Sequence, residues 1–361
     1  MTGSLLVTGG LGFIGRAVVD RALADGWSVR VLDSLRADVH GDDPAGAGRP
    51  DWGDDVEVII GDVRDPDAVA SALRGIDAVC HQAAKVGLGV DIGDAPDYTA
   101  SNSLGTAVLL SAMRDAGIDR LALASSMVVY GEGLYRDGDR LMQAPPRSRA
   151  DLEAGRFEPR SPDTGDALVP VLIDEDQPCD PRNTYAATKF EQELLARDWA
   201  RGTGGRAALL RYHNVYGPWM PQGTPYAGVA SLFRSSLEQG EAPQVFEDGR
   251  QRRDFIHVSD VAAANLAALR WTTDAEDGTA RAFNVASGTV HTIGDFAVAL
   301  ADAMGGPAPQ VTGQFRLGDV RHITASSDRI RSELSWEPAV AFADGVAQFA
   351  HDPVRPAVAR R

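Results

Sequence analysis

An apolar strand pattern runs directly into a glycine-rich turn in the segment Leu5-Leu6-Val7-Thr8-Gly9-Gly10-Leu11-Gly12-Phe13-Ile14-Gly15. A helical pattern follows to about Asp25. Gly9, Gly12 and Gly15 are three residues apart, and glycines at this spacing permit a tight turn and a close approach of the backbone to a pyrophosphate. The first turn of the helix would add amide groups and the positive end of the helix dipole. The segment therefore predicts the first strand–turn–helix unit of a parallel α/β sheet, with a phosphate-bearing ligand at the turn.

An acidic residue closes the second apolar stretch. Residues 27–32 have a strand pattern, and Asp33 stands about 20 residues beyond the turn, where an acid binds the ribose hydroxyls of an adenine dinucleotide. A carboxylate at this place would repel a 2′-phosphate, so the sequence favours NAD over NADP as the cofactor. The cofactor residues expected from this first unit are Gly9, Gly12, Phe13, Ile14, Gly15 and Asp33.

Strand patterns alternate with helical patterns along the first half of the chain. Further strands are expected at residues 56–60, 78–81, 121–124 and 207–212, with a helix at 97–116. This rhythm predicts a doubly wound parallel sheet, in which the carboxyl ends of the strands line the ligand crevice. Residues just beyond two of these ends are therefore candidate cofactor contacts: Asp62, Val63, Ala83, Ala84 and Lys85. An alternative for Asp62 is that it is simply an acid at a helix N-terminus.

Tyr185 and Lys189 stand four residues apart in a helical pattern that begins near Asn183. Side chains at this spacing share a helix face, with Cβ atoms about 5–6 Å apart. The chain has seven tyrosines but only two lysines, Lys85 and Lys189, so chance explains the pairing poorly. A nearby ammonium lowers the pKa of a phenol, and a base useful at neutral pH needs a shift of about three units. One lysine cannot supply that shift, so we expect a second cation and partial burial to contribute.

The chain is acidic and has few cysteines. Its 361 residues carry a net charge of −16, with a pI near 4.8, which argues against broad binding of nucleic acids or anionic membranes. Cys80 and Cys179 provide neither a disulfide framework nor a metal-ligand spacing, so we expect a reducing, cytoplasmic location and no metal. There is no signal-like segment and no run of about 18 apolar residues, so no membrane partner is expected.

The character of the chain changes twice after residue 131. Residues 132–180 are polar and proline-rich, and they predict an insertion or lid with little regular structure. Beyond Pro218 the alternating rhythm is interrupted. We therefore expect an NAD-binding domain over residues 1–212 and a smaller C-terminal substrate lobe over residues 213–361, with part of 252–286 returning to the first domain.

Motifs along nearly the whole chain resemble the extended short-chain dehydrogenase/reductases, and within them the NAD-dependent nucleotide-sugar epimerase/dehydratase family. The matching segments, in family order, are TGGLGFIG at 8–15, GDVRD at 61–65, SSMVVYG at 125–131, YAATK at 185–189, LRYHNVYGP at 210–218, RDFIHV at 253–258 and RLGD at 316–319. The resemblance implies a Rossmann-type fold, a tightly held NAD and a catalytic triad of Ser126, Tyr185 and Lys189. It also implies a homodimer formed by the helix after the fourth strand and the Tyr185 helix.

The resemblance assigns further residues to the two ligands. Asn102 matches the family's cofactor-side asparagine and Asn214 a substrate-side one. Arg253 and Arg316 match the diphosphate-binding arginines, although the basic run around Arg253 could also be a solvated loop. Ser126 and Val245 are further expected substrate contacts, and His213 stands where the family commonly has Phe.

Departures from the family pattern help to choose the reaction. The 4,6-dehydratases of the family carry an Asp-Glu pair just after the active-site Ser/Thr, and its decarboxylases keep a Glu there, whereas this chain has Met127 and Val128. We therefore expect epimerisation of a UDP- or dTDP-sugar at carbon 4 through a transient 4-keto intermediate. The chain is most similar to bacterial nucleotide-sugar 4-epimerases of the dTDP-L-rhamnose type. The alternatives are a nucleotide-sugar 4-ketoreductase, which releases its cofactor, and a non-catalytic dinucleotide sensor.

Overall fold

Seven parallel strands form the central sheet, in the order β13-β9-β5-β4-β1-β2-β3. The structure is a computed structural model that describes residues 3–40, 50–87, 92–222 and 228–355. The strands of this sheet are β1 (Ser4–Thr8), β2 (Ser28–Asp33), β3 (Val56–Ile60), β4 (Ala78–His81), β5 (Arg120–Ser126), β9 (Arg206–Tyr212) and β13 (Ala280–Val285). The doubly wound parallel sheet expected from the sequence is thereby confirmed.

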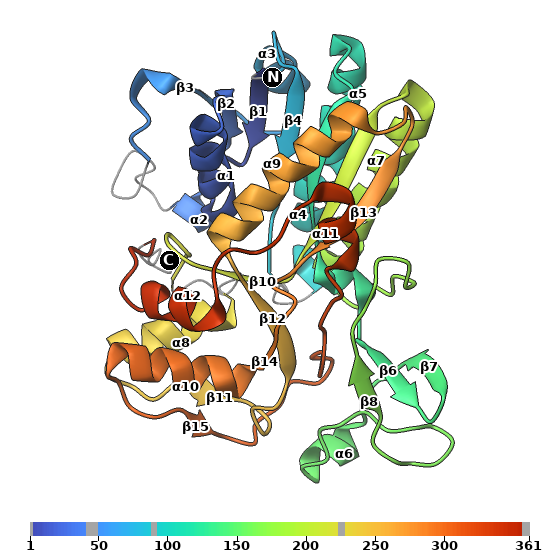
Figure 1. Cartoon of the computed structure of the whole chain (residues 1–361), viewed down its shortest axis with the longest axis vertical. Helices are drawn as coiled ribbons and strands as arrows, with labels where there is room; N and C mark the ends of the chain where they lie inside the picture. Colours follow the sequence, from blue (N-terminus) through green and yellow to red (C-terminus); the bar gives the residue numbers. More distant parts are fainter. Residues whose placement is uncertain (1–2, 41–49, 88–91, 223–227, 356–361) are drawn as a thin grey trace.

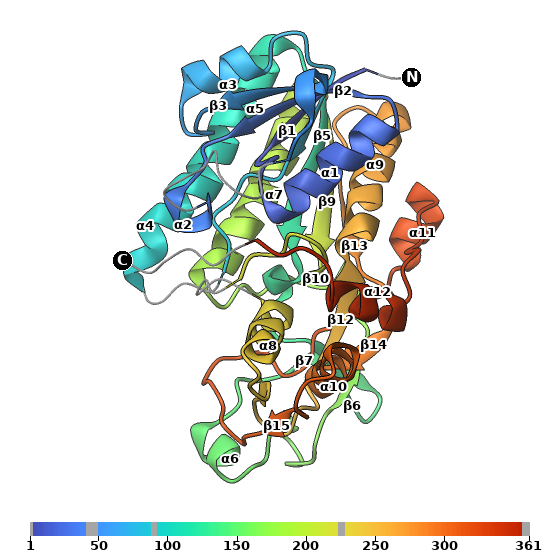
Figure 2. The ribbon, with the colours of Figure 1, turned by 90° about the vertical axis from the view of Figure 1, so that its left-hand side faces the viewer.

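Helices cover both faces of this sheet (Figures 1 and 2). One face is covered by α1 (Phe13–Ala24) and α9 (Val258–Asp274), and the other by α3 (Pro66–Ala72), α5 (Gly105–Ala116) and α7 (Thr184–Thr203). Each face buries its own apolar cluster against the helices. The strand order reverses at β1, which lies between β4 and β2, and ligands of such sheets bind at this reversal.

The helix expected at 97–116 is present but not uniform. It consists of α4 (Ala95–Tyr98), a π-helical segment (Thr99–Leu104) and α5. Between β2 and β3 lie the short helix α2 (Ala37–His40) and a 3₁₀ turn (Gly53–Asp55), and residues 41–49 of this connection lie outside the described residues.

A smaller lobe lies below the strand carboxyl ends in Figure 1. Its elements are β10 (Asn214–Tyr216), α8 (Val229–Glu238), β11 (Gln244–Val245), β12 (Arg252–His257), β14 (Val290–Thr292), α10 (Ile293–Met304), β15 (Gln310–Val311) and α12 (Phe342–Phe349). Between β12 and β14 the chain returns to the large lobe as α9 and β13, and α11 (Asp328–Leu334) later packs on the same two elements. No helix of the described residues is long and apolar enough to cross a membrane.

The insertion at 132–180 has more regular structure than the sequence suggested. It contains an antiparallel sheet in the order β7-β6-β8 and the short helix α6 (Arg149–Glu153). The strands are β6 (Leu134–Asp137), β7 (Arg140–Gln143) and β8 (Val169–Val171). A two-residue turn with Gly138 at φ 59° joins β6 to β7, because Asp137 pairs directly with Arg140. The expectation of little regular structure was wrong because proline and charge content obscured this short hairpin.

Candidate active site

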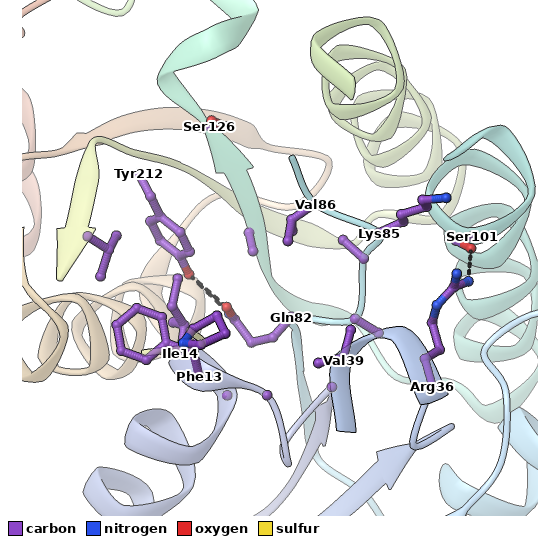
Figure 3. Close-up of a pocket in the computed structure, with 18 of the residues that line it drawn as sticks. Phe13, Ile14, Arg36, Val39, Gln82, Lys85, Val86, Ser101, Ser126 and Tyr212 are labelled. Carbon is purple, nitrogen blue, oxygen red and sulfur yellow. Dashed lines mark hydrogen bonds between the residues drawn. The ribbon is translucent and has the colours of Figure 1, made fainter. Parts of the chain in front are cut away.

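A cavity of about 380 Å³ opens at the carboxyl ends of the central strands, and residues of both lobes line it. Most of the site residues expected from the sequence lie on its wall. They are Gly9, Gly12, Phe13, Ile14, Gly15, Asp33, Asp62, Val63, Ala83, Ala84, Lys85, Ser126, Tyr185, Lys189 and Asn214. Figure 3 shows Phe13 and Ile14 gathered with Gln82 and Tyr212 on one side of the cavity, and Lys85 with Arg36 on the other.

The glycine turn between β1 and α1 fits a dinucleotide. Gly9 has φ 67°, and a Cβ placed there would lie 2.7 Å from the backbone nitrogen of Ala83, so only glycine lets the two segments touch. Helix α1 begins after Gly12 without a side-chain cap, which leaves its first-turn amide groups to an outside acceptor. Amide groups at a helix N-terminus bind phosphate, so this turn would hold the pyrophosphate of NAD.

Asp33 ends β2 at the rim of this turn and is 7% exposed. One carboxylate oxygen accepts the amide of Leu11 at 3.0 Å, and the other accepts the amide of Leu35 at 2.9 Å. The acid therefore fastens the glycine turn as well as lining the cavity. Its remaining acceptor positions fit the ribose hydroxyls expected for it.

Other expected cofactor residues have ionic partners of their own. The Asp62 carboxylate accepts from the Arg64 guanidinium, which is the main cause of its lowered pKa. The Lys85 ammonium lies 2.7 Å from an Asp97 carboxylate oxygen. Both side chains keep a place on the cavity wall.

Helix α7 presents Tyr185 and Lys189 to the cavity. The Asn183 side chain accepts the Ala186 amide at 2.8 Å, and this N-cap starts the helix so that Tyr185 falls in its first turn. Lys189 lies one turn further and is 3% exposed, and its ammonium donates to the Ala124 carbonyl at 2.9 Å. Ser126, at the end of β5, also lines the cavity, and its hydroxyl lies near enough to the Tyr185 hydroxyl to lower the pKa of the phenol. The helical spacing read from the sequence thus brings three reactive groups to one wall.

Burial is the main influence on the pKa values of Tyr185 and Lys189. It raises the pKa of Tyr185 to about 12, against a smaller opposing effect of the Ser126 hydroxyl. Burial also lowers the pKa of Lys189 to about 7, and only the nearby Glu193 carboxylate opposes it. The expectation that partial burial would help to ionise the tyrosine was therefore wrong, because burial on its own disfavours the phenolate.

A buried ion pair supports the reactive face of α7 from behind. Glu193 is fully buried, and its carboxylate receives two hydrogen bonds from Arg211 of β9, at 2.9 and 2.8 Å. The Ser125 hydroxyl donates to the same carboxylate at 2.6 Å. Sequence reasoning missed this network, although Glu193 stands at helical spacing from Lys189.

Four expected residues do not line the cavity. Asn102 is fully buried and hydrogen-bonds the backbone of Lys85 and the Thr188 hydroxyl, so it shapes the wall from outside. Val245 is 1% exposed and belongs to the core of the smaller lobe, because β11 is enclosed there. Arg253 donates to the carbonyls of Val320 and Arg321, and Arg316, which is exposed, lies over the Phe246 ring.

His213 and Arg355 are among the polar residues of the wall to which the sequence analysis assigned no role. The side chain of His213, between β9 and β10, is 4% exposed and lines the cavity. Arg355 lines it from the other end of the chain, and its guanidinium donates to the Leu11 carbonyl at 2.6 Å. His213 was visible as a departure from the family pattern, whereas no local pattern marks Arg355. No group of three His, Cys, Asp or Glu side chains suited to a metal ion occurs within the part of the chain that the structure describes.

A model of the NAD dependent epimerase/dehydratase family matches residues 5–162 and 163–286. The chain belongs to this family. It is similar to the dTDP-L-rhamnose 4-epimerase of Burkholderia thailandensis, with 33% identity over 351 residues, 96% of this chain and 93% of that one. It is also similar to the UDP-glucose 4-epimerase of Mycolicibacterium smegmatis, with 29% identity over 354 residues, 95% of this chain and 96% of the other.

Solved structures of family members share the fold. The UDP-glucose 4-epimerase of Thermus thermophilus, solved with NAD, has a TM-score of 0.74 and 28% identity, covering 96% of this chain and 97% of its own. The UDP-N-acetylglucosamine 4-epimerase of Methanobrevibacter ruminantium has a TM-score of 0.77 and 26% identity, and 97% of each chain is covered. NAD is thus the cofactor of the family, and the glycine turn and Asp33 of this chain suit it.

Proposed function

We propose that this protein is an NAD-dependent nucleotide-sugar 4-epimerase that acts on a UDP- or dTDP-hexose. The observation that carries the proposal is the convergence of Ser126, Tyr185 and Lys189 on the wall of a cavity that also holds the dinucleotide turn. Met127 and Val128 follow Ser126 in a 3₁₀ turn, contribute no carboxylate and do not line the cavity. The relatives named as 4-epimerases support the same reaction.

The residues of this chain divide the work of proton transfer. Tyr185 takes the proton of the sugar 4-hydroxyl and later returns it, and Ser126 shares the hydrogen bond to the same oxygen. Lys189 contributes positive charge from the next turn of α7. The glycine turn and Asp33 would hold NAD, which would supply the hydride-transfer chemistry and, in its oxidised form, the second cation that Tyr185 needs. The tyrosine is therefore ready to react when cofactor and sugar are both in place.

The test is to purify the protein and add nucleotide sugars without a reductant. We expect NAD(H) to stay bound through gel filtration, which mass spectrometry of the denatured protein would detect. We also expect interconversion of a UDP- or dTDP-hexose with its 4-epimer, which NMR would follow. Accumulation of a 4-keto-6-deoxy sugar, or a strict need for added NADPH, would contradict the proposal. A 4-ketoreductase would release its cofactor, and a dinucleotide sensor would bind NAD without turnover.

We propose further that Arg253 and Arg316 hold the diphosphate of the substrate, with Asn214 beside the sugar. Both guanidinium groups lie close enough to Asp319 to act on its pKa, which supports a common site for them. A charge-assisted hydrogen bond contributes roughly 1.5–3 kcal/mol, so Arg253→Ala should weaken substrate binding about 10- to 150-fold with NAD retained. The exposed neighbour Arg250 provides the control. Equal effects of Arg253→Ala and Arg250→Ala in a calorimetric titration would place the diphosphate elsewhere.

The proposed assembly is a homodimer that pairs α5 and α7 with their copies, in the cytoplasm. Leu109, Leu110 and Met113 turn out to face the sheet, so the support is narrower than the sequence suggested. Leu104 and Leu194 remain 51% and 49% exposed on this side of the molecule. Light scattering should give a dimer at micromolar concentration, and Leu194→Asp should weaken it. A monomeric wild-type protein would refute the assembly.

A further inference from the structure

His213 is a buried polar side chain that finds no hydrogen-bond partner within the described residues. Its ring is 4% exposed, and both Nδ1 and Nε2 are enclosed without a donor or acceptor. A neutral imidazole has one donor and one acceptor, and leaving such groups unpaired in the interior costs about 1–3 kcal/mol each. The ring also lines the cavity. The missing partner is therefore to be sought inside the cavity rather than in the protein.

The position of His213 along its strand tells which wall it occupies. Arg211 reaches the Glu193 carboxylate on α7, whereas Tyr212 reaches Asn265 on α9 at 2.9 Å. Because successive side chains of an extended chain point to opposite faces, His213 returns to the face of α7. The His213 amide still bonds the Val285 carbonyl at 3.1 Å, which continues the pairing of β9 with β13.

The register along this face then relates His213 to the reactive groups. Helix α7 returns antiparallel to the strands, so a step from Arg211 toward the end of β9 corresponds to a step from Glu193 back toward Tyr185. Ser126 pairs with Tyr212, the residue just before His213. The imidazole thus lies on the cavity wall near the end of β5 that carries Ser126, and Tyr185 and Lys189 line the same cavity.

The surroundings of His213 keep it neutral. Burial lowers the pKa of His213 to about 3, and the Arg253 guanidinium nearby acts in the same direction. A neutral imidazole can donate from one nitrogen and accept at the other, and an alcohol hydroxyl is a partner that can likewise both accept and donate. The neighbouring wall residue Asn214 also has a buried side-chain oxygen without a hydrogen-bond partner in the described chain.

From these observations we infer that His213 hydrogen-bonds a hydroxyl group of the hexose and thereby helps to select the sugar. This inference rests on the proposed function, because it takes the ligand of the cavity to be a nucleotide sugar. A phenylalanine at this position would give an apolar wall, which cannot form a hydrogen bond with that hydroxyl. Discrimination by one such contact is largest when its loss leaves a buried polar group unpaired.

The test is a cycle that combines protein variants with ligand analogues. Calorimetry on NAD-loaded protein measures the affinities for UDP, UDP-glucose and the 2-, 3- and 6-deoxy analogues of UDP-glucose, and for dTDP and dTDP-L-rhamnose. We expect His213→Phe to lower the affinity for UDP-glucose or dTDP-L-rhamnose about 10- to 100-fold, while the affinity for the corresponding nucleoside diphosphate stays unchanged. For wild-type protein, one deoxy analogue should have a lower affinity than UDP-glucose. For His213→Phe, the same analogue and UDP-glucose should have equal affinities. His213→Gln, which keeps a donor and an acceptor, should recover part of the loss.

His257→Phe is the matched control, because His257 is 7% exposed and its Nε2 has no hydrogen-bond partner among the described residues, but it does not line the cavity. It should lower the melting temperature without changing the preference for the sugar over the nucleoside diphosphate. The inference would be overturned if His213→Phe lost affinity equally for UDP and UDP-glucose. It would also be overturned if every deoxy analogue had the same affinity relative to UDP-glucose in both proteins. If His213→Phe loses NAD, the same comparison is made with His213→Gln. Failure of wild-type protein to bind any nucleotide sugar would instead refute the proposed function.

Discussion

At Tyr185, burial raises the pKa of the phenol and the nearby Ser126 hydroxyl lowers it, and the effect of burial is the larger. In the mechanism that we propose, Tyr185 therefore stays protonated until the sugar hydroxyl and the oxidised cofactor are present. The low polarity that raises the pKa also strengthens the field of any cation placed beside the ring. The wall therefore links ionisation of Tyr185 to occupation of the site.

The first prediction at this scale is the effect of removing the phenol hydroxyl. Tyr185→Phe should lose turnover about 10²- to 10⁴-fold, the usual contribution of a positioned acid–base group, and should retain bound NAD. Turnover is measured by NMR with saturating substrate and cofactor content by absorbance after denaturation. Unchanged turnover would remove Tyr185 from the mechanism.

The second prediction concerns the pH dependence that Lys189 confers. The pKa of Lys189 is about 7 in the folded protein against an ordinary value of 10.5, so between these values the unfolded chain binds a proton that the folded chain does not. The free energy of unfolding of wild-type protein should therefore rise with pH relative to Lys189→Met, by up to about 1.4 kcal/mol per pH unit from pH 7 upward. Urea unfolding of both proteins at pH 7 to 9.5, with saturating NAD, provides the comparison. Parallel pH profiles would mean that Lys189 has an unshifted pKa.

At the scale of elements, ion pairs join the insertion to the smaller lobe: Arg147 of the insertion lies 2.8 Å from a Glu247 carboxylate oxygen, and Arg321 contacts both parts. Arg321 is fully buried, and its guanidinium contacts Glu158 of the insertion and both Glu247 and Asp248 of the lobe. Its amide also donates to Glu132 at 3.0 Å. The insertion is thus tied to the loop that carries Arg316.

Arg321→Ala should destabilise the protein by about 1–3 kcal/mol, because it removes the hydrogen bonds of a fully buried guanidinium, although Glu247 keeps its pair with Arg147 and Glu158 keeps its pair with His322. The smaller lobe and the insertion should become sensitive to limited proteolysis before the central sheet does. Arg281→Ala, which removes an exposed pair with Glu333, should cost about 0–1 kcal/mol. If the two variants unfold at the same urea concentration, the Arg321 cluster does not hold the insertion.

Sequence patterns predicted the elements that depend on local periodicity and missed those that depend on tertiary contacts. The strand–turn–helix unit and the Tyr185–Lys189 pair follow from spacing, and the parallel sheet follows from the alternation of elements. The Glu193–Arg211 pair could not be predicted, because it forms only when β9 lies beneath α7. For the same reason, the placement of Asn102 outside the cavity depends on how the helix passes behind Lys85.

At the scale of the whole molecule, a late segment of the chain reaches back to its first turn. The backbone of Arg355 pairs with Met220 and Gln222 of the smaller lobe, and its side chain bonds Leu11 in the glycine turn. The other terminal nitrogen, Nη1, is enclosed without a hydrogen-bond partner among the described residues, while the side chain lines the cavity. This segment thus bridges the two lobes beside the cofactor turn.

Arg355→Ala should weaken the retention of NAD about 10- to 100-fold, because it removes a charge-assisted hydrogen bond at the glycine turn and a cation near the pyrophosphate position. The rate of NAD loss during dialysis, followed by fluorescence, measures the effect. Arg270→Ala is the control, since Arg270 joins α9 to Asp25 on the surface without lining the cavity. If wild-type protein and Arg355→Ala lose NAD at the same rate, the segment around Arg355 has no role in holding the cofactor.

The contact between Leu11 and Arg355 also has a consequence for biosynthesis. A ribosome makes residue 11 early and residue 355 more than 300 residues later, so the glycine turn emerges long before the side chain that closes against it. The seventh strand of the sheet, β13, is likewise made only after the smaller lobe has begun. A nascent chain that stalls in between has an open nucleotide site and an unpaired edge on β9, which is a state that chaperones engage. Closure of the C-terminal segment over the glycine turn therefore comes at the end of synthesis.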